Sequence, residues 1–262
     1  MKIRLDAELV RRELARSREN ALDLIDSRSV LVNGIPATKP ATMVNAETSI
    51  KLAGERDEFV SRGGHKLAGA LDAFKGVVVE GRRALDAGAS TGGFTDVLLR
   101  RGAVHVVAVD VGYGQLAWRL RQDNRVSILD RTNIRHLTPA IVGEAIDLVV
   151  ADLSFISLAL VLPALSAVTK PEADFVVMVK PQFEVGREKL GAGGVVRDPA
   201  LRKAAVVAVA ESAYGVGLGT VAIAASPLPG PAGNVEYFLW LRRGAPALEL
   251  DALDQAIASG PQ

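Results

Sequence analysis

The chain has 262 residues, of which 49% are hydrophobic, and its formal net charge is only +1. This length and composition can fill a sizeable core, which excludes an intrinsically disordered chain. Cysteine is absent, which excludes disulfides, thiolate metal sites and cysteine nucleophiles. The three histidines, His65, His105 and His136, are too scattered along the sequence to predict a metal centre. We therefore expect a globular, cytoplasmic protein without a bound metal.

The first 53 residues predict a small α+β domain. Apolar side chains recur at helical spacing in residues 7–15, and Ser17 is a suitable N-cap for a second helix. Residues 30–32 read as a short strand that runs into Asn33-Gly34, a dipeptide typical of two-residue hairpin turns. Residues 49–52 supply a further strand that closes the unit.

Basic side chains concentrate near the N-terminus, although the chain is nearly neutral overall. The motifs Arg4-Leu5-Asp6 and Leu14-Ala15-Arg16-Ser17-Arg18, followed by the hairpin at residues 30–34, resemble the RNA-binding domain named after ribosomal small-subunit protein four. That resemblance implies helices that present cations to structured RNA, where guanidinium groups suit phosphate contacts. The implied RNA-binding residues are Arg4, Arg11, Arg12, Arg16, Arg18 and Lys39. The alternative is that these side chains only solubilise a helical hairpin.

Residues 54–59 form a charged connector, and we place the domain boundary there. Residues 1–59 are expected to hold the RNA-binding domain and connector, and residues 60–262 a second, larger domain.

The larger domain alternates apolar strand candidates with amphipathic segments, which predicts a parallel, doubly wound α/β sheet. Strands are expected at residues 83–85, 104–109, 126–129, 148–151 and 175–179. Two later strands, at 221–225 and 235–241, have only a short Pro/Gly-rich link between them and should pair antiparallel. A Rossmann-like sheet that ends in such a hairpin is typical of S-adenosylmethionine methyltransferases. The most apolar stretch, residues 153–169, falls short of a membrane span and predicts a buried helix.

The first strand of this domain runs into a glycine-rich turn over residues 86–94. Glycines at such a turn let the backbone approach a ligand closely, and Asp110, after the next strand, can accept both ribose hydroxyls of a nucleoside. This arrangement alone fits NAD as well as S-adenosylmethionine. However, the glycines do not spell G-x-G-x-x-G, and the Asp86 carboxylate would repel a pyrophosphate but suits an ammonium and a sulfonium.

We therefore favour S-adenosylmethionine as the cofactor. The predicted cofactor-binding residues are Asp86, Gly88, Ser90, Thr91, Gly92, Asp110, Val111 and Asp130. Asp130 would accept the adenine amino group, and its alternative is a turn or N-cap aspartate.

Asp152 and Lys180 each follow an apolar strand, at the edge of the sheet where α/β proteins bind their ligands. Amine methyltransferases place an Asn/Asp-Pro-Pro-aromatic motif at the first position, but residues 152–155 contain no proline. A ribose 2′-hydroxyl is a poor nucleophile that needs a cation or a base. Lys180, flanked by Lys66 and oriented by Asp152 and Glu236, suits that task.

The tetrad Lys66, Asp152, Lys180 and Glu236 resembles that of the FtsJ-type ribose 2′-O-methyltransferases. Together with the N-terminal module and the motifs at residues 61–67, 86–94, 110–116 and 180–184, the chain is similar to the TlyA family over almost its full length. The resemblance implies a cytidine 2′-O-methyltransferase that acts on rRNA within ribosomal subunits. The connector departs from the family, since Arg56-Asp57-Glu58-Phe59 stands where an Arg-Ala-Trp-like sequence is expected.

Two alternatives belong to other functional classes. A non-catalytic RNA-binding factor for ribosome assembly could use a degenerate methyltransferase fold, although the intact Asp86 turn and tetrad argue against it. A hemolysin or pore-former, a label that many family members carry, requires an exposed amphipathic or membrane-spanning segment, and the sequence predicts none. The Gly-rich residues 186–198 predict a lid over the target nucleotide.

Overall fold

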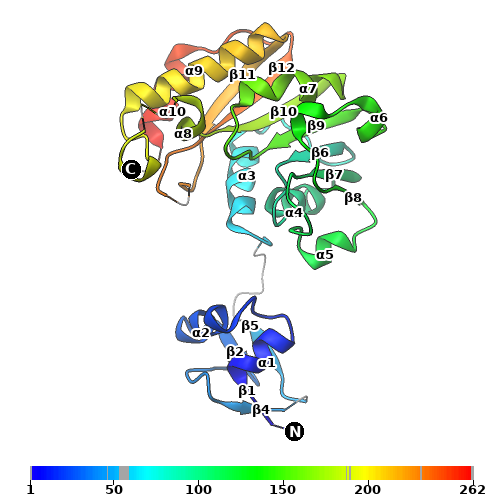
Figure 1. The fold of residues 1–262 in the computed structure, drawn as a ribbon, viewed down its shortest axis with the longest axis vertical. Coiled ribbons are helices and arrows are strands. Elements are labelled where there is room, and N and C mark those ends of the chain that lie inside the picture. Colours follow the sequence, from blue (N-terminus) through cyan, green and yellow to red (C-terminus); the bar gives the residue numbers. More distant parts are fainter. Residues whose placement is uncertain are drawn as a thin grey trace. The chain divides into compact units, whose positions relative to one another are not determined.

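The computed structural model describes residues 2–45, 47–52, 59–186, 188, 190–230 and 232–260. The chain divides into two compact units, Met1–Glu58 and Phe59–Gln262 (Figure 1). Of the predicted connector, residues 54–58, including Arg56, Asp57 and Glu58, lie outside the described residues.

The first unit is a small α+β module (Figure 1). Its elements are β1 (Ile3–Arg4), α1 (Leu5–Arg11), α2 (Arg18–Asp26), β2 (Val30–Val32), β3 (Ile35–Pro36), β4 (Met43–Val44) and β5 (Ile50–Leu52). Strand β2 lies between β3 and β5, and β1 pairs with β4. Its core is formed by buried aliphatic side chains from both helices and from β2, β4 and β5.

Sequence signals in this unit set the ends of its elements. The prediction that Ser17 caps the second helix is confirmed, because its side chain accepts a hydrogen bond from Asn20 N at 3.1 Å. The predicted hairpin turn is also confirmed, with positive φ at Asn33 and Gly34. Helix α1 ends at Arg11 rather than at residue 15, since Glu13 adopts a φ of +59°, which is incompatible with a right-handed helix.

Within the described residues of the second unit, seven strands form one sheet in the order β11-β12-β10-β9-β6-β7-β8. Their bounds are β6 (Arg83–Ala87), β7 (His105–Val109), β8 (Val126–Leu129), β9 (Ile146–Ala151), β10 (Thr169–Val179), β11 (Leu218–Ala225) and β12 (Tyr237–Arg243). Strands β6 to β10 pair in parallel, whereas β12 runs antiparallel to both β10 and β11. The predicted doubly wound sheet with a C-terminal antiparallel hairpin is confirmed.

Helices cover both faces of this sheet (Figure 1). One face packs on α3 (Arg62–Ala73), α4 (Gly93–Arg100) and α5 (Trp118–Arg121). The other packs on η1 (Ile134–His136), α6 (Pro139–Val142), η2 (Leu158–Leu160), α7 (Leu162–Ala167), α9 (Pro199–Gly215) and α10 (Leu250–Ser259). Neighbouring residues of a strand face opposite cores, so that Val149 joins one and Val150 the other. Two short helices, α8 (Pro181–Glu184) and η4 (Ala192–Gly194), follow β10.

The prediction of one buried helix over residues 153–169 is wrong. Only Leu162–Ala167 is α-helical there, and Thr169 already begins β10. Ser157 accepts a hydrogen bond from Ala159 N and so starts the 3-10 helix η2, while Pro163 occupies the first turn of α7. Among the described residues, no helix has both the length and the apolar character needed to cross a membrane.

Candidate active site

The topology brings the four predicted catalytic residues to one end of the sheet. Asp152 and Lys180 directly follow the parallel strands β9 and β10, and parallel strands end at a common edge. Glu236 directly precedes β12, where Tyr237 pairs with Val179, so Glu236 lies next to Lys180 across the antiparallel ladder. Lys66 comes from the second turn of α3.

These four side chains form two lysine–carboxylate pairs. Lys66 Nζ donates to Glu236 Oε2 at 2.5 Å, and both side chains are buried, with 9% and 1% of their surface exposed. Lys180 Nζ lies 2.5 Å from Asp152 Oδ1 and donates to Ser154 Oγ at 3.1 Å. The burial of Lys66 and Glu236 requires that their charges be paired, because an isolated buried ion is very costly.

The two pairs lie close to each other. A Cβ on Gly63, in the first turn of α3, would be 3.9 Å from Asp152 Oδ2, so the helix that carries Lys66 approaches Asp152. Glu236 Oε1 is buried and has no hydrogen-bond donor among the described residues. A buried carboxylate oxygen without a donor is rare in proteins and is a common sign of a functional site.

A pocket of about 390 Å³ opens beside Asp152 at the same end of the sheet. Its lining residues are Gly88, Ser90, Val109, Asp110, Val111, Gln115, Asn133, Ile134, Asp152, Leu153, Ser154, Phe155, Ile156 and Val161. Four predicted cofactor-binding residues therefore line it, namely Gly88, Ser90, Asp110 and Val111. A ligand bound in this pocket would therefore lie next to the Lys180–Asp152 pair.

The turn after β6 shapes one wall of this pocket. Gly88 has a φ of +88°, and a Cβ there would lie 2.5 Å from the carbonyl oxygen of Asp152, so only glycine fits. The Asp110 carboxylate accepts hydrogen bonds from Ser90 N at 2.8 Å and from Gly112 N at 2.7 Å. Asp110 thereby ties the turn after β6 to the loop after β7.

Asp86 is fully buried behind this wall. Its Oδ2 accepts a hydrogen bond from Thr95 Oγ1 at 2.6 Å, whereas its Oδ1 has no hydrogen-bond partner in the part of the chain that the structure describes. Burial raises the pKa of Asp86 to about 7, the Thr95 hydrogen bond opposes this rise, and the charges of Asp152 and Asp110 add to it. A cation placed in the pocket would favour the charged carboxylate.

Four predicted cofactor residues, Asp86, Thr91, Gly92 and Asp130, are not among the residues that line the pocket. Gly92 adopts a left-handed conformation where α4 begins. Asp130 Oδ2 accepts a hydrogen bond from Gly114 N at 3.0 Å and lies 3.7 Å from Arg121 Nη1. These contacts match the turn-aspartate alternative, and the adenine role of Asp130 stays a prediction.

Sequence reasoning missed Phe155, although it lies in the motif that begins with Asp152. Its side chain is 90% exposed, its φ is +64°, and its ring centroid lies 5.0 Å from that of Phe183. Lys180 Nζ is 5.9 Å from the centroid of the Phe183 ring. An exposed aromatic held in a strained conformation beside a pocket is a signal of function. Asn133 and Gln115 in the pocket lining were also missed, because isolated amides in loops carry no pattern.

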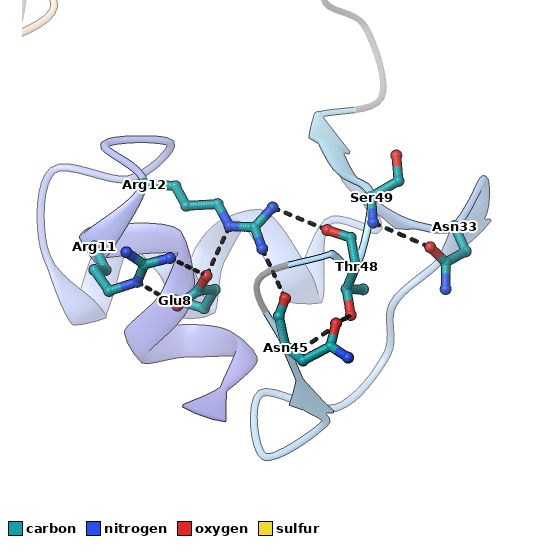
Figure 2. Close-up of polar contacts among 7 residues, drawn as sticks. All are labelled: Glu8, Arg11, Arg12, Asn33, Asn45, Thr48 and Ser49. Atoms are coloured by element: carbon teal, nitrogen blue, oxygen red, sulfur yellow. Dashed lines mark hydrogen bonds and ion pairs between the residues drawn. The ribbon is translucent and has the colours of Figure 1, made fainter. Parts of the chain in front are cut away.

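In the first unit, two of the predicted RNA-binding arginines serve an internal network, which Figure 2 shows. Buried Glu8 accepts hydrogen bonds from Arg11 at 2.7 and 2.6 Å and from Arg12 at 2.7 Å, which lowers the pKa of Glu8 to about 2. Arg12 also donates to the carbonyl oxygens of Thr48 and Asn45 at 2.9 and 2.8 Å (Figure 2). Arg12 thus joins α1 to the loop before β5.

The other predicted RNA-binding side chains, Arg4, Arg16, Arg18 and Lys39, are exposed. Arg4 pairs with Asp6 through hydrogen bonds of 3.0 Å. The structure therefore leaves an exposed basic set on this unit, distinct from the Glu8 network.

A mostly parallel sheet with one antiparallel hairpin and a glycine turn at the carboxyl edge is the fold of the α/β methyltransferases, and the second unit belongs to that class. A solved S-adenosylmethionine-dependent methyltransferase from Mesorhizobium loti shares this fold, with a TM-score of 0.51, 17% identity and coverage of 67% of this chain and 96% of that one. The FtsJ-like methyltransferase family model matches residues 59–243, and the S4 domain model matches residues 3–50.

Full-length relatives define the family more closely. The chain is 59% identical, over 98% of both sequences, to the 16S/23S rRNA (cytidine-2'-O)-methyltransferase TlyA of Mycobacterium tuberculosis. A solved protein from Streptococcus thermophilus that is named as a hemolysin matches with a TM-score of 0.76 and 37% identity, covering 98% of this chain and 94% of that one. The chain therefore belongs to the TlyA family of FtsJ-like methyltransferases.

Proposed function

We propose that this protein transfers a methyl group from S-adenosylmethionine to the ribose 2′-hydroxyl of a cytidine in rRNA of the ribosomal subunits. The observation that carries the proposal is the Lys180–Asp152 pair at the edge of the pocket formed by the Gly88 turn. The activity named for the relative from Mycobacterium tuberculosis supports the same reaction. Such an enzyme works where ribosomal subunits are present, in the cytoplasm.

The residues around the pocket fit S-adenosylmethionine. The Asp86 Oδ1 atom that lacks a partner suits a cationic ligand, and the Gly88 turn gives close backbone approach. We assign cofactor binding to these residues together with Ser90, Asp110 and Val111. When bound, S-adenosylmethionine supplies a methyl group activated by its sulfonium.

The chain's own residues prepare the hydroxyl. The Lys180 ammonium stabilises the negative charge that develops on the 2′-oxygen as its proton passes to solvent water, and Asp152 holds that ammonium in place. The Lys66–Glu236 pair adds a second cation at the same end of the sheet and fixes α3 to β12. Electrostatic stabilisation by a preorganised group of this kind typically contributes about a hundredfold or more in rate.

We further propose how RNA is recognised. The exposed ring of Phe155 offers a flat apolar surface on which a base can stack. Phe155 contacts the ring of Phe183, and that ring in turn lies near Lys180 Nζ. The RNA-binding domain and connector, expected over residues 1–59, would end one residue earlier, because Phe59 packs on His65 of the second unit. Arg4, Arg16, Arg18 and Lys39 would be its phosphate contacts, and residues 59–262 would be the catalytic domain. The lid over the target nucleotide, expected over residues 186–198, stays a proposal for residues 190–198, since residues 187 and 189 lie outside the described residues.

The experiment combines cofactor binding with mapping of the modification. Purified protein is titrated with S-adenosylmethionine by calorimetry and then incubated with ribosomal subunits and methyl-labelled cofactor, and the label is located by mass spectrometry of nuclease digests. Label on a cytidine ribose supports the proposal. Label on a base contradicts the 2′-hydroxyl assignment, and absence of cofactor binding favours a non-catalytic assembly factor. Leakage of liposomes by the same preparation would favour a hemolysin.

A further inference from the structure

Glu184 ends α8, four residues after Lys180, and both oxygens of its partly buried carboxylate bind another segment of the chain. Oε2 accepts a hydrogen bond from Ser157 Oγ at 2.5 Å, and Oε1 accepts one from Leu158 N at 2.9 Å. Both donors lie in the segment that follows β9. One side chain from the end of α8, the short helix after β10, therefore clamps the segment that begins with Asp152.

That clamped segment, residues 152–158, carries much of the site. It contains Asp152 and Phe155, and five of its residues line the cofactor pocket. The segment begins at a fixed point, since Asp152 N donates to the carbonyl oxygen of Ala87 at 3.0 Å. Its far end is fixed by Glu184 and by Leu158, which is buried in the core. Between these two points the backbone holds Phe155 at positive φ.

The other ion pair, side-chain hydrogen bond and ring contact between residues 152–158 and residues 180–184 each include a residue that lines the pocket, namely Asp152, Ser154 or Phe155. They are the Lys180–Asp152 ion pair, the Lys180–Ser154 hydrogen bond and the tilted ring contact between Phe155 and Phe183. A substrate bound in the pocket would compete for these groups. Glu184 holds the two segments together through contacts that do not face the pocket, because neither Glu184 nor Ser157 lines it.

We propose that Glu184 is a positioning residue for methyl transfer, which fixes the distance between Asp152 and Lys180 and the place of the Phe155 ring. The inference rests on the proposed function and extends it to a residue outside the tetrad. A misplacement of about 1 Å in such a site lowers rates by up to about a hundredfold. Removal of the clamp should therefore reduce the rate of transfer more than it reduces cofactor affinity.

Four variants test this role. Glu184→Ala removes the clamp, and Glu184→Gln keeps it, because the amide oxygen can accept from Leu158 N while the amide nitrogen donates to Ser157 Oγ. Ser157→Ala removes one of the two hydrogen bonds. Glu211→Ala is the matched control, since Glu211 is an exposed glutamate on α9. Single-turnover methylation of ribosomal subunits, the Kd for S-adenosylmethionine and Tm are measured for each.

We expect Glu184→Ala to lower the single-turnover rate about tenfold or more, with the Kd changed by less than about threefold. Glu184→Gln should keep most of the wild-type rate, and Ser157→Ala should be intermediate. A further variant that combines Glu184→Ala with Ser157→Ala should be no slower than Glu184→Ala, because Glu184 and Ser157 act as one unit.

Different results would overturn different claims. A wild-type rate in Glu184→Ala would contradict the positioning role of Glu184 and leave the proposed function unaffected. An equally low rate in Glu184→Gln and Glu184→Ala would mean that the carboxylate itself takes part in the chemistry. A Kd that weakens in step with the rate would make Glu184 a structural support of the pocket. Absence of methylation by the wild-type protein and by Glu211→Ala would remove the proposed function and, with it, this inference.

Discussion

The Asp86 carboxylate combines complete burial, an oxygen without a partner and two neighbouring acidic groups, Asp152 and Asp110. Its pKa is about 7 in the folded protein, above its ordinary value of 3.8. The folded state therefore binds this proton more tightly than the unfolded state does. The resulting stabilisation is fully present below pH 3.8 and is lost as the pH rises through 7.

We expect Asp86→Asn to remove this pH dependence, because an amide stays neutral and its oxygen can still accept the Thr95 hydrogen bond. The Tm of the variant should exceed that of the wild type at pH 8 by a few degrees or more, and the difference should shrink at pH 5. Affinity for S-adenosylmethionine should fall at both pH values. Thermal melts from pH 5 to 8 provide the measurement. A Tm difference that does not change with pH would mean that Asp86 is not protonated in the free protein.

At Phe155, exposure and backbone strain coincide beside the pocket. If the ring stacks on a base, Phe155→Ala should weaken rRNA-dependent turnover by about tenfold, since base stacking contributes roughly 1–3 kcal/mol. Phe155→Trp should retain activity. Leu250→Ala is the control, because Leu250 is also an exposed apolar residue, at 55%. Full activity of Phe155→Ala under subsaturating RNA would exclude the stacking role.

Among the elements of the fold, the turn after β6 restricts most strongly which residue can occupy a position. Gly88→Ala brings a Cβ to within 2.5 Å of the Asp152 carbonyl oxygen, a backbone atom that cannot move without displacing β9. Gly81→Ala is a matched control, because Gly81 also has positive φ, +73°, but has no atom within 4 Å of its Cβ position.

Both variants carry the cost of a left-handed alanine, about 1 kcal/mol, so their difference isolates the clash. We expect Gly88→Ala to have the lower Tm and to bind S-adenosylmethionine at least about tenfold more weakly, and Gly81→Ala to bind normally. Calorimetry and thermal melts on the two proteins decide this. Equal affinities would show that the turn is free to relax and does not form the pocket wall.

The sequence was most informative where a strand end or a cap is encoded locally. The ends of β9 and β10 could be read from apolar runs that stop at Asp152 and Lys180, and Ser17 marked the start of α2. Composition alone misled over residues 153–169, because an apolar run does not reveal the Ser157 cap that breaks it. The pairing of Lys66 with Glu236 across 170 residues follows only from the fold. The hydrogen bond from Arg12 to the buried Glu8 could not be predicted from the clustering of charges either.

At the scale of the whole molecule, the chain consists of two units with separate cores, Met1–Glu58 and Phe59–Gln262. The first residues of the second unit, Phe59 and Val60, make specific contacts with the rest of that unit. Phe59 stacks edge-on with His65 and lies under the Arg100 guanidinium, and Val60 N donates to the Asp96 carboxylate at 2.9 Å. A cut after residue 58 leaves these contacts in place.

We expect the protein without residues 1–58 to fold and to bind S-adenosylmethionine, but to methylate ribosomal subunits poorly. It lacks the exposed basic set of Arg4, Arg16, Arg18 and Lys39, and the log–log salt dependence of RNA binding should fall by roughly one unit for each phosphate that these side chains no longer neutralise. Circular dichroism and filter binding on the same sample test this. A well-folded truncation with undiminished rRNA affinity would remove the first unit from RNA recognition, and an unfolded one would make that unit a structural requirement.

The central claim is that Lys180 drives methyl transfer to a ribose hydroxyl, and its most direct test compares wild-type protein with Lys180→Ala on ribosomal subunits. Lys170→Ala is the matched control, because Lys170 lies at the start of the same strand and also pairs with an aspartate, Asp147, at 2.7 Å. The measurement is the single-turnover rate of 2′-O-methylation with saturating S-adenosylmethionine, together with the Kd for that cofactor. The account predicts a rate about a hundredfold or more lower for Lys180→Ala, an unchanged Kd, and a wild-type rate for Lys170→Ala. A wild-type rate for Lys180→Ala would contradict it.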